Sequence, residues 1–254
     1  IAERLFDPRE LLGYTDEEWQ FLQNQMICDL NEGYAIYRPR YILPDYNVYI
    51  KKGCEFLELP APKDLDEALD GLLILYSHVP SITTFPVYIG RLDMLLDPFI
   101  TDEEQDYIKI KRFLNHVDKT VPDSFCHANI GPYDTRAGRL ILKAVIELEA
   151  PTPNMTIRYD KSKTSREFAE LAAKACLLVS KPSFANDAYY ISDLGEQYGI
   201  ASCYNALPEC GGAYTLTRLR LGTIARACKT VDEMVNELLP RVAKCALSTM
   251  DKRH

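Results

Sequence analysis

The chain contains 254 residues, of which 47% are hydrophobic and 26% are charged, a composition typical of a globular protein rather than a disordered, fibrous or membrane one. Its formal net charge of -8 at pH 7 argues against a nucleic-acid-binding protein, because such proteins usually carry a basic surface. No apolar run approaches the length of a membrane span. The chain begins at Ile1 rather than Met and reaches His254 within a helical pattern, so we expect a segment cut from a longer protein.

The eight cysteines do not form a recognisable disulfide or metal-binding pattern. Their spacings are wide and irregular, the sequence contains no C-x-x-C pair, and only four histidines could share a metal site. With no secretory signal at the start, a reducing cytoplasm is the expected location, and no bound metal is expected. Most of these thiols are expected to be small buried hydrophobes. They are Cys28, Cys54, Cys126, Cys176, Cys203, Cys210, Cys228 and Cys245.

Helices are predicted where a capping Thr or Asp is followed three residues later by Glu, because the two side chains satisfy free N–H groups of the first turn. The first pair is Thr15 with Glu18, and a Pro- and Tyr-rich stretch at residues 34–49 then indicates an extended segment. Two of the following helices are expected to end before Pro80 and Pro122. The remaining capping pairs are Asp64 with Glu67, Thr101 with Glu104, Thr164 with Glu167, and Thr230 with Glu233.

The second half of the chain adds strands to the helices. A helical pattern covers residues 135–150, and the alternating run Asn154–Tyr159 predicts a strand after it. Alternating helices and strands favour an α/β layer with parallel strands. Further strands are expected, separated by glycines, at residues 187–192, 199–207 and 214–221. The two expected regions are residues 1–120, mainly helical, and residues 121–254, α/β.

The first candidate for chemistry is Cys203, which lies between a strand-like run and a loop rich in structure-breaking residues. Pro208, Gly211 and Gly212 allow a sharp turn, so the thiol is expected at or near a loop tip that faces a cavity. The alternative is a core cysteine at the end of a strand, since free cysteine is among the most buried residue types.

Several polar residues are weaker candidates. His127 and Asn129, in a polar stretch between two predicted helices, could point at a ligand or cap the neighbouring helix ends. Asn186, with Asp187 beside it, follows a possible strand and could reach a site at the strand ends or make a local turn. His78 is expected at a helix C-terminus, where it meets the negative end of the helix dipole.

A series of short motifs extends over most of the chain. They are YRPRYILPD (37–45), HVPS (78–81), PVYIG (86–90), HANIGP (127–132), PNMTIRY (153–159), YGIASCYN (198–205) and TRL (217–219). In this order and spacing, the set resembles the glycyl radical enzymes, the group around pyruvate formate-lyase, and within that group the YjjI-type branch.

The resemblance implies a ten-stranded α/β barrel of two half-barrels, with Cys203 on a finger loop inside it. It implies that Cys203 becomes a thiyl radical that abstracts hydrogen from a small organic substrate, in an anaerobic lyase or acyltransferase-like reaction. It also implies a storage radical on a backbone glycine of a C-terminal domain, installed there by a separate iron–sulfur activating enzyme that uses S-adenosylmethionine. The expected substrate-binding residues are His127, Asn129, Asn186 and Asn205, and the expected assembly is a homodimer.

The sequence also departs from the family pattern. The glycine motif, an Arg-Val-small-Gly-aromatic run, is absent, because Lys244 stands where the glycine should follow Arg241 in a segment that indicates a helix. We therefore expect the glycine radical domain to lie outside this chain, no cofactor to be bound within it, and this chain alone to be inactive. Ser202 replaces a cysteine of the pyruvate-cleaving enzymes and Asn205 a glutamate of the diol dehydratases, which argues against both activities.

Two other functions are open alternatives. Cys203 could be the nucleophile of a transferase or hydrolase activated by His127, which requires a reactive thiol of low pKa. The chain could instead be a truncated, non-catalytic module that binds a small molecule or a partner. On the leading hypothesis the partners are the small-molecule substrate and the activating enzyme, with neither nucleic acid nor membrane expected.

Overall fold

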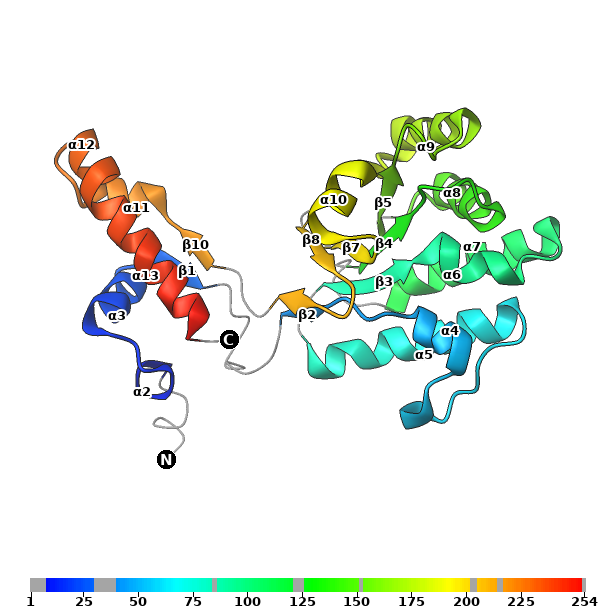
Figure 1. The fold of residues 1–254 in the computed structure, drawn as a ribbon, viewed down its shortest axis with the longest axis horizontal. Coiled ribbons are helices and arrows are strands. Elements are labelled where there is room, and N and C mark those ends of the chain that lie inside the picture. The colour runs from blue at the N-terminus through cyan, green and yellow to red at the C-terminus, as the bar shows by residue number, and fades with distance from the viewer. Residues whose placement is uncertain are drawn as a thin grey trace. The chain divides into compact units, whose positions relative to one another are not determined.

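The computed structural model describes residues 8–29, 40–83, 86–120, 126–150, 153–201, 205–213 and 217–252. The chain forms two compact units, one of residues 41–212 and one of residues 1–40 with 213–254 (Figure 1). It passes between them at two short strands, β2 (Tyr41–Ile42) and β9 (Gly212–Ala213). The expected boundary at residue 120 does not coincide with these limits, because strands on either side of it pair in one sheet.

The larger unit is built on a four-stranded parallel sheet with the strand order β3-β4-β5-β6. The predicted α/β class with parallel strands is therefore confirmed, and the sheet of the described residues is open rather than closed into a barrel. Parallel neighbours need a crossover connection, which a helix supplies in each case. The strands are β3 (Val87–Arg91), β4 (Cys126–Ile130), β5 (Asn154–Tyr159) and β6 (Ser183–Asn186). The crossover helices are α7 (Glu103–Thr120), α8 (Arg136–Leu148) and α9 (Arg166–Val179).

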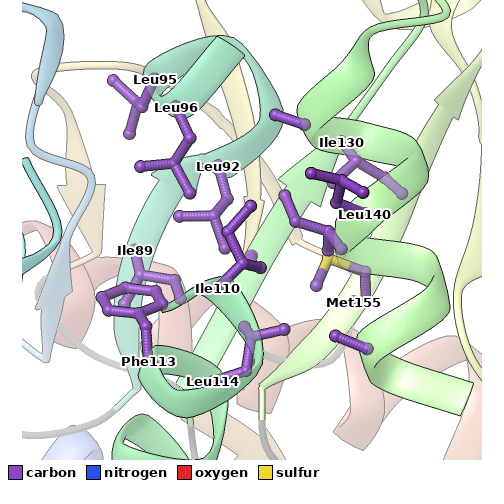
Figure 2. Close-up of a cluster of buried hydrophobic side chains, with 14 of the residues drawn as sticks. Ile89, Leu92, Leu95, Leu96, Ile110, Phe113, Leu114, Ile130, Leu140 and Met155 are labelled. Atoms are coloured by element: carbon purple, nitrogen blue, oxygen red, sulfur yellow. The ribbon is translucent and has the colours of Figure 1, made fainter. Parts of the chain in front are cut away.

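The hydrophobic core lies between the sheet and these helices (Figure 2). Ile89 of β3, Ile130 of β4 and Met155 of β5 contribute from the strands. Ile110 and Leu140 contribute from α7 and α8, and each of these side chains is at most 7% exposed. Side chains alternate between the two faces of a strand, so the residues between these positions point to the opposite face of the sheet. Two short elements after β3, α6 (Leu92–Leu96) and η2 (Asp97–Phe99), complete this side.

The segment of residues 126–132 is not the polar loop between two helices that the sequence indicated. Residues 126–130 form β4, a strand whose five residues are all buried. The pattern was misleading because β4 has His127 and Asn129 on a face that is polar and yet covered. The breakers Gly131 and Pro132 follow the strand directly and mark its end.

The segment predicted as a strand at residues 187–192 is a helix, α10 (Asp187–Leu194). Its tyrosines and isoleucine favour a strand, but the caps decide otherwise. The Asn186 side chain accepts the N–H of Tyr189 at 3.2 Å, and Gly195 ends the helix with a φ of 82°.

Helix α5 (Leu65–Ile82) begins where predicted, because Asp64 accepts the N–H of Glu67 at 2.9 Å. It does not end before Pro80 as expected. The proline lacks an N–H donor, but the chain keeps its helical turn and closes it with a bond from the Thr83 N–H to the Val79 carbonyl. Before α5 lie α4 (Asn47–Lys52) and η1 (Glu55–Leu57).

The caps of α7 and α9 each lie one residue after the predicted position. Asp102, rather than Thr101, accepts the N–H groups of Glu104 and Gln105. Ser165, rather than Thr164, accepts the N–H of Phe168 at 3.1 Å. In both cases a second capping residue stands beside the predicted one, so spacing alone could not separate them.

The last two strands of the larger unit form an antiparallel hairpin, β7 (Tyr198–Ala201) and β8 (Asn205–Pro208). The segment predicted as one strand at residues 199–207 is thus divided between two strands. Their register pairs Gly199 with Leu207 and Ala201 with Asn205.

The smaller unit combines both ends of the chain. Strands β1 (Ile27–Asp29) and β10 (Thr217–Leu219) pair antiparallel within it. Its helices pack around a small core made of Phe21, Met26, Ile27, Ile224, Val242, Cys245 and Ala246. The helical elements are α2 (Pro8–Leu12), α3 (Asp16–Gln23), α11 (Leu221–Arg226), α12 (Val231–Glu233), η4 (Met234–Leu238) and α13 (Leu239–Asp251).

A buried carboxylate joins the two ends of the chain in this unit. Glu18 is 3% exposed and completes the predicted capping box with Thr15, whose N–H it accepts at 2.7 Å. It also accepts a hydrogen bond from Lys252 at 2.6 Å. Burial by itself opposes ionisation of Glu18, but hydrogen bonds from Lys252, Ser248 and Thr15 outweigh it and lower its pKa to about 2.

Replacing Glu18 with Gln is expected to destabilise the smaller unit at pH 7 by about 2–3 kcal/mol, since each unit of pKa corresponds to about 1.4 kcal/mol. The folded pKa lies below the unfolded one. The stabilisation of the folded unit by ionised Glu18 is therefore fully present above about pH 4.5 and is lost as the pH falls toward about 2. Urea unfolding followed by the fluorescence of Trp19, the one tryptophan of the chain, measures it.

The matched control is Glu17→Gln. Glu17 is exposed and pairs with Arg241 at the surface, so its loss is expected to change stability by less than about 0.5 kcal/mol. A Glu18→Gln deficit that stays constant from pH 7 to pH 2.5 would contradict the assignment.

Candidate functional site

The face of the sheet turned away from the helices carries polar side chains. Tyr88 pairs in register with His127, and Asn129 pairs with Thr156, so each pair points the same way. Arg158 lies two residues after Thr156 on β5 and therefore shares this face. All five residues are at most 8% exposed. A buried polar face must be covered by groups that satisfy it, because unpaired polar atoms are costly away from water.

The hairpin β7–β8 provides that cover. The Asn129 side chain donates from Nδ2 to the Ile200 carbonyl at 2.9 Å and accepts the Ile200 N–H at Oδ1 at 2.7 Å. The Tyr88 hydroxyl also donates to Asn129 Oδ1, at 3.4 Å. One side-chain amide therefore pairs with a strand as a neighbouring backbone would. Asn129, expected to bind substrate, has both its amide groups engaged by β7.

Gly199 allows the hairpin to approach the sheet closely. A Cβ atom at this position would lie 2.5 Å from the Tyr88 hydroxyl oxygen and 2.8 Å from a methyl carbon of Leu43. Tyr88 and Leu43 are fully buried and have little room to move. The absence of a side chain at residue 199 is therefore a packing requirement.

A buried ion pair holds the start of the hairpin. Arg158, 1% exposed, donates from Nε to Asp187 at 2.7 Å, and the Tyr198 hydroxyl donates to the same carboxylate oxygen at 2.8 Å. The other two guanidinium nitrogens donate to the carbonyls of Tyr198 and Glu196, both at 3.2 Å. The guanidinium carbon lies 3.9 Å from the centre of the Tyr198 ring. Lys163 approaches the second oxygen of Asp187 at 3.6 Å.

His127 is held as a neutral imidazole. It is 8% exposed on the polar face, and burial lowers its pKa to about 4. At neutral pH the imidazole of His127 can donate one hydrogen bond and accept another, but it is a weak base. The sequence placed His127 and Asn129 together, and the structure puts them two residues apart on the same face of β4.

The other two predicted polar residues have structural partners. Asn186, for which the sequence left open a ligand site or a local turn, caps α10 and lies at the carboxyl end of β6. Asn205 begins β8 and donates to the Tyr41 hydroxyl at 2.8 Å. Cys203 belongs to residues 202–204, between β7 and β8, and lies outside the described residues.

Arg158 and Tyr88 were not among the residues predicted from the sequence. A charged residue inside the otherwise regular strand Asn154–Tyr159 is the signal that could have found Arg158, because a charge there needs a buried partner. Asp187, noted only as the neighbour of Asn186, is that partner.

A cavity of about 380 Å³ adjoins the hairpin. The described residues that line it present hydroxyl, amide and aromatic groups and carry no formal charge. They are Thr156, Ser183, Phe184, Ala185, Asn186, Tyr189, Tyr190 and Ile200. Within the part of the chain that the structure describes, no group of three or more His, Cys, Asp or Glu side chains could hold a metal ion. No described helix combines the length and hydrophobicity that crossing a lipid bilayer requires.

Replacing Gly199 with Ala is expected to destabilise the larger unit by about 1–3 kcal/mol, because the added methyl group overlaps Tyr88 and Leu43. The control is Gly222→Ala in α11, where the nearest atom to the new Cβ is 3.8 Å away. That change should be neutral or stabilise by up to about 1 kcal/mol. Thermal unfolding followed by circular dichroism compares the two. Equal melting temperatures for both variants would refute the close approach.

The larger unit is expected to lose stability as the pH falls from about 6.5 to about 4, because the unfolded chain protonates His127 before the folded one does. The full effect is about 3 kcal/mol. His127→Gln should flatten this part of a stability-against-pH profile measured by urea unfolding. His116→Gln, at an exposed position of α7, is the matched control and should keep the wild-type slope. A slope unchanged by His127→Gln would count against the buried neutral imidazole.

Known proteins are similar to this sequence over most or all of its length. The family model of the YjjI-like glycyl radical enzymes matches residues 1–254. An uncharacterized protein of Haemophilus influenzae is 92% identical over 254 residues, which are 100% of this chain and 49% of that protein. The uncharacterized protein YjjI of Escherichia coli (strain K12) is 45% identical over 235 residues, 91% of this chain and 46% of that protein. The chain thus spans about half the length of the curated relatives it matches. It belongs to the YjjI-like family of glycyl radical enzymes.

Proposed function

We propose that the full-length protein is a glycyl radical enzyme in which Cys203 abstracts a hydrogen atom from a small organic substrate. Family membership supports the class of chemistry. The observation that carries the choice of residue is the hairpin. Its first strand is buried along its whole length and is fixed to the polar face of the sheet, and Cys203 follows two residues after its end.

The proposed step is a hydrogen-atom transfer. A glycine-centred radical, installed outside this chain by an S-adenosylmethionine-dependent activating enzyme, takes the hydrogen atom of the Cys203 thiol, which restores the glycine C–H bond and leaves the unpaired electron on sulfur. The sulfur radical of Cys203 takes a hydrogen atom from a substrate C–H bond. A thiol and a carbon-centred substrate radical result, and the total charge and number of electrons are unchanged. Such a step needs no base beside the cysteine, in contrast to nucleophilic catalysis.

The surroundings of the hairpin suit this chemistry. Tyr198, Ile200 and Ala201 are at most 2% exposed, and a reactive radical must be kept from water and other donors. The lining of the adjoining cavity supports a small, uncharged substrate that carries hydroxyl or carbonyl groups, because the described lining residues offer hydrogen bonds and rings but no counter-charge.

The alternative of a cysteine nucleophile activated by His127 is less well supported. That mechanism needs an imidazole that accepts the thiol proton and keeps it near neutral pH. Burial lowers the pKa of His127 to about 4, which makes its cationic form unfavourable. The radical step makes no such demand on the imidazole.

Cys203→Ala in the full-length protein tests the proposal. The wild type and the variant are co-expressed anaerobically with the activating enzyme and examined by electron paramagnetic resonance. Each is then incubated with a small-molecule extract of anaerobic cells, and consumed compounds are identified by mass spectrometry. Both proteins should show a glycine-centred signal, but only the wild type should consume a compound, with the variant at background.

Cys210→Ala is the matched control, since Cys210 is an exposed cysteine seven residues further along the chain. It should consume the same compound as the wild type. The absence of a glycine-centred signal in the activated wild type would overturn the radical class. Consumption by Cys203→Ala at the wild-type rate would overturn the role of Cys203.

A further inference from the structure

One edge of β7 is held by side chains of the sheet instead of by a neighbouring strand. The carbonyls of Tyr198 and Ile200 in β7, and that of Glu196 in the bend just before it, accept hydrogen bonds from Arg158 and Asn129, at 2.9 to 3.2 Å. Residues at alternate positions of a strand direct their carbonyls to the same edge. The three carbonyls therefore form one row that faces the sheet, while β8 pairs along the opposite edge.

If the hairpin shifted by one residue relative to the sheet, the carbonyls of this row would no longer face Arg158 and Asn129, because carbonyl direction alternates along a strand. The row therefore excludes such a shift. It does not by itself exclude a slip by two residues, which would present an equivalent row of carbonyls. Two other contacts do so. Among the described residues of β7 and β8, only Gly199 lacks the side chain that would collide with Tyr88, and only Tyr198 donates a hydroxyl to Asp187.

We infer that Asn129, Arg158 and Asp187, here called the β7 clamp, are positioning residues that fix the register of the hairpin, whose two strands flank Cys203 in the sequence. The catalytic meaning of the clamp rests on the proposed function, whereas its effect on the hairpin does not. The clamp combines a forked guanidinium on two carbonyls, a buried counter-charge and an amide on Ile200. Lysine cannot reproduce the fork, because its ammonium is a point charge.

The amide of Ile200 reports directly on the clamp. Its N–H is bound to Asn129, and Ile157, buried in β5, provides a reference inside the sheet. Hydrogen exchange of both amides can be followed by NMR on the 254-residue chain labelled with ¹⁵N-isoleucine. Arg158→Lys and Tyr198→Phe are the two variants. Tyr198→Phe keeps the ring over the guanidinium and removes only the hydroxyl, so it is the variant that preserves the fold.

Loss of one such hydrogen bond corresponds to roughly five- to tenfold faster opening. We expect Ile200 to exchange at least roughly fivefold faster in Tyr198→Phe and faster still in Arg158→Lys, with Ile157 unchanged. Arg166→Lys, at an exposed arginine of α9, is the control and should leave both amides as in the wild type. Unchanged exchange of Ile200 in Tyr198→Phe, or equal acceleration of Ile157, overturns the clamp.

The full-length protein tests the catalytic consequence. Activated Arg158→Lys should keep the glycine-centred signal of the wild type but consume at least roughly tenfold less of the compound that the wild type consumes, a pattern that general unfolding would not give. Wild-type consumption in Arg158→Lys would overturn the positioning role. If instead Cys203→Ala retains consumption, the proposed function fails while the exchange result for the clamp stands.

Discussion

The larger unit depends on the satisfaction of one buried positive charge. Arg158 projects from the sheet into a region that water does not reach, and removing a guanidinium from water costs several kcal/mol. Its partners are Asp187 at the start of α10, the carbonyl of Glu196 just before β7, and the carbonyl of Tyr198 within β7. None of these elements satisfies the charge alone, so the sheet, the helix and the hairpin are interdependent.

Much of the helical structure could be predicted from capping chemistry, because a cap is a local interaction between residues close in sequence. Thr15, Asp64 and Thr230 cap helices as their spacing indicated. Two caps shifted by one residue, to Asp102 and Ser165, where two capping residues stand side by side. The spacing therefore predicted where these helices lie, but it did not predict their first residue, which depends on packing.

The strands and the site were less predictable, because what decides them is distant in sequence. β5 was predicted from its alternation, but β4 was missed since His127 and Asn129 look solvent-exposed until the hairpin covers them. The turn after Pro208 followed from its breakers, but the hairpin did not, since residues 199–207 were expected to form one strand. The role of Arg158 did not, because its partner Asp187 lies 29 residues away, and no local pattern links a charge in a strand to a carboxylate at a later helix.

The attachment of β7 through side chains also bears on the order of folding. Strands β3 to β6 precede the hairpin in the chain, and within the described residues their backbone pairing is with one another, so the sheet can be complete before β7 and β8 have docked. Until the hairpin docks, the side chains of Arg158 and Asn129 are hydrated. The sheet formed first therefore does not contain a buried charge without a partner. Docking then buries the charge and supplies its partners in a single event. The hairpin can therefore separate from the sheet without breaking backbone hydrogen bonds between the strands of the sheet.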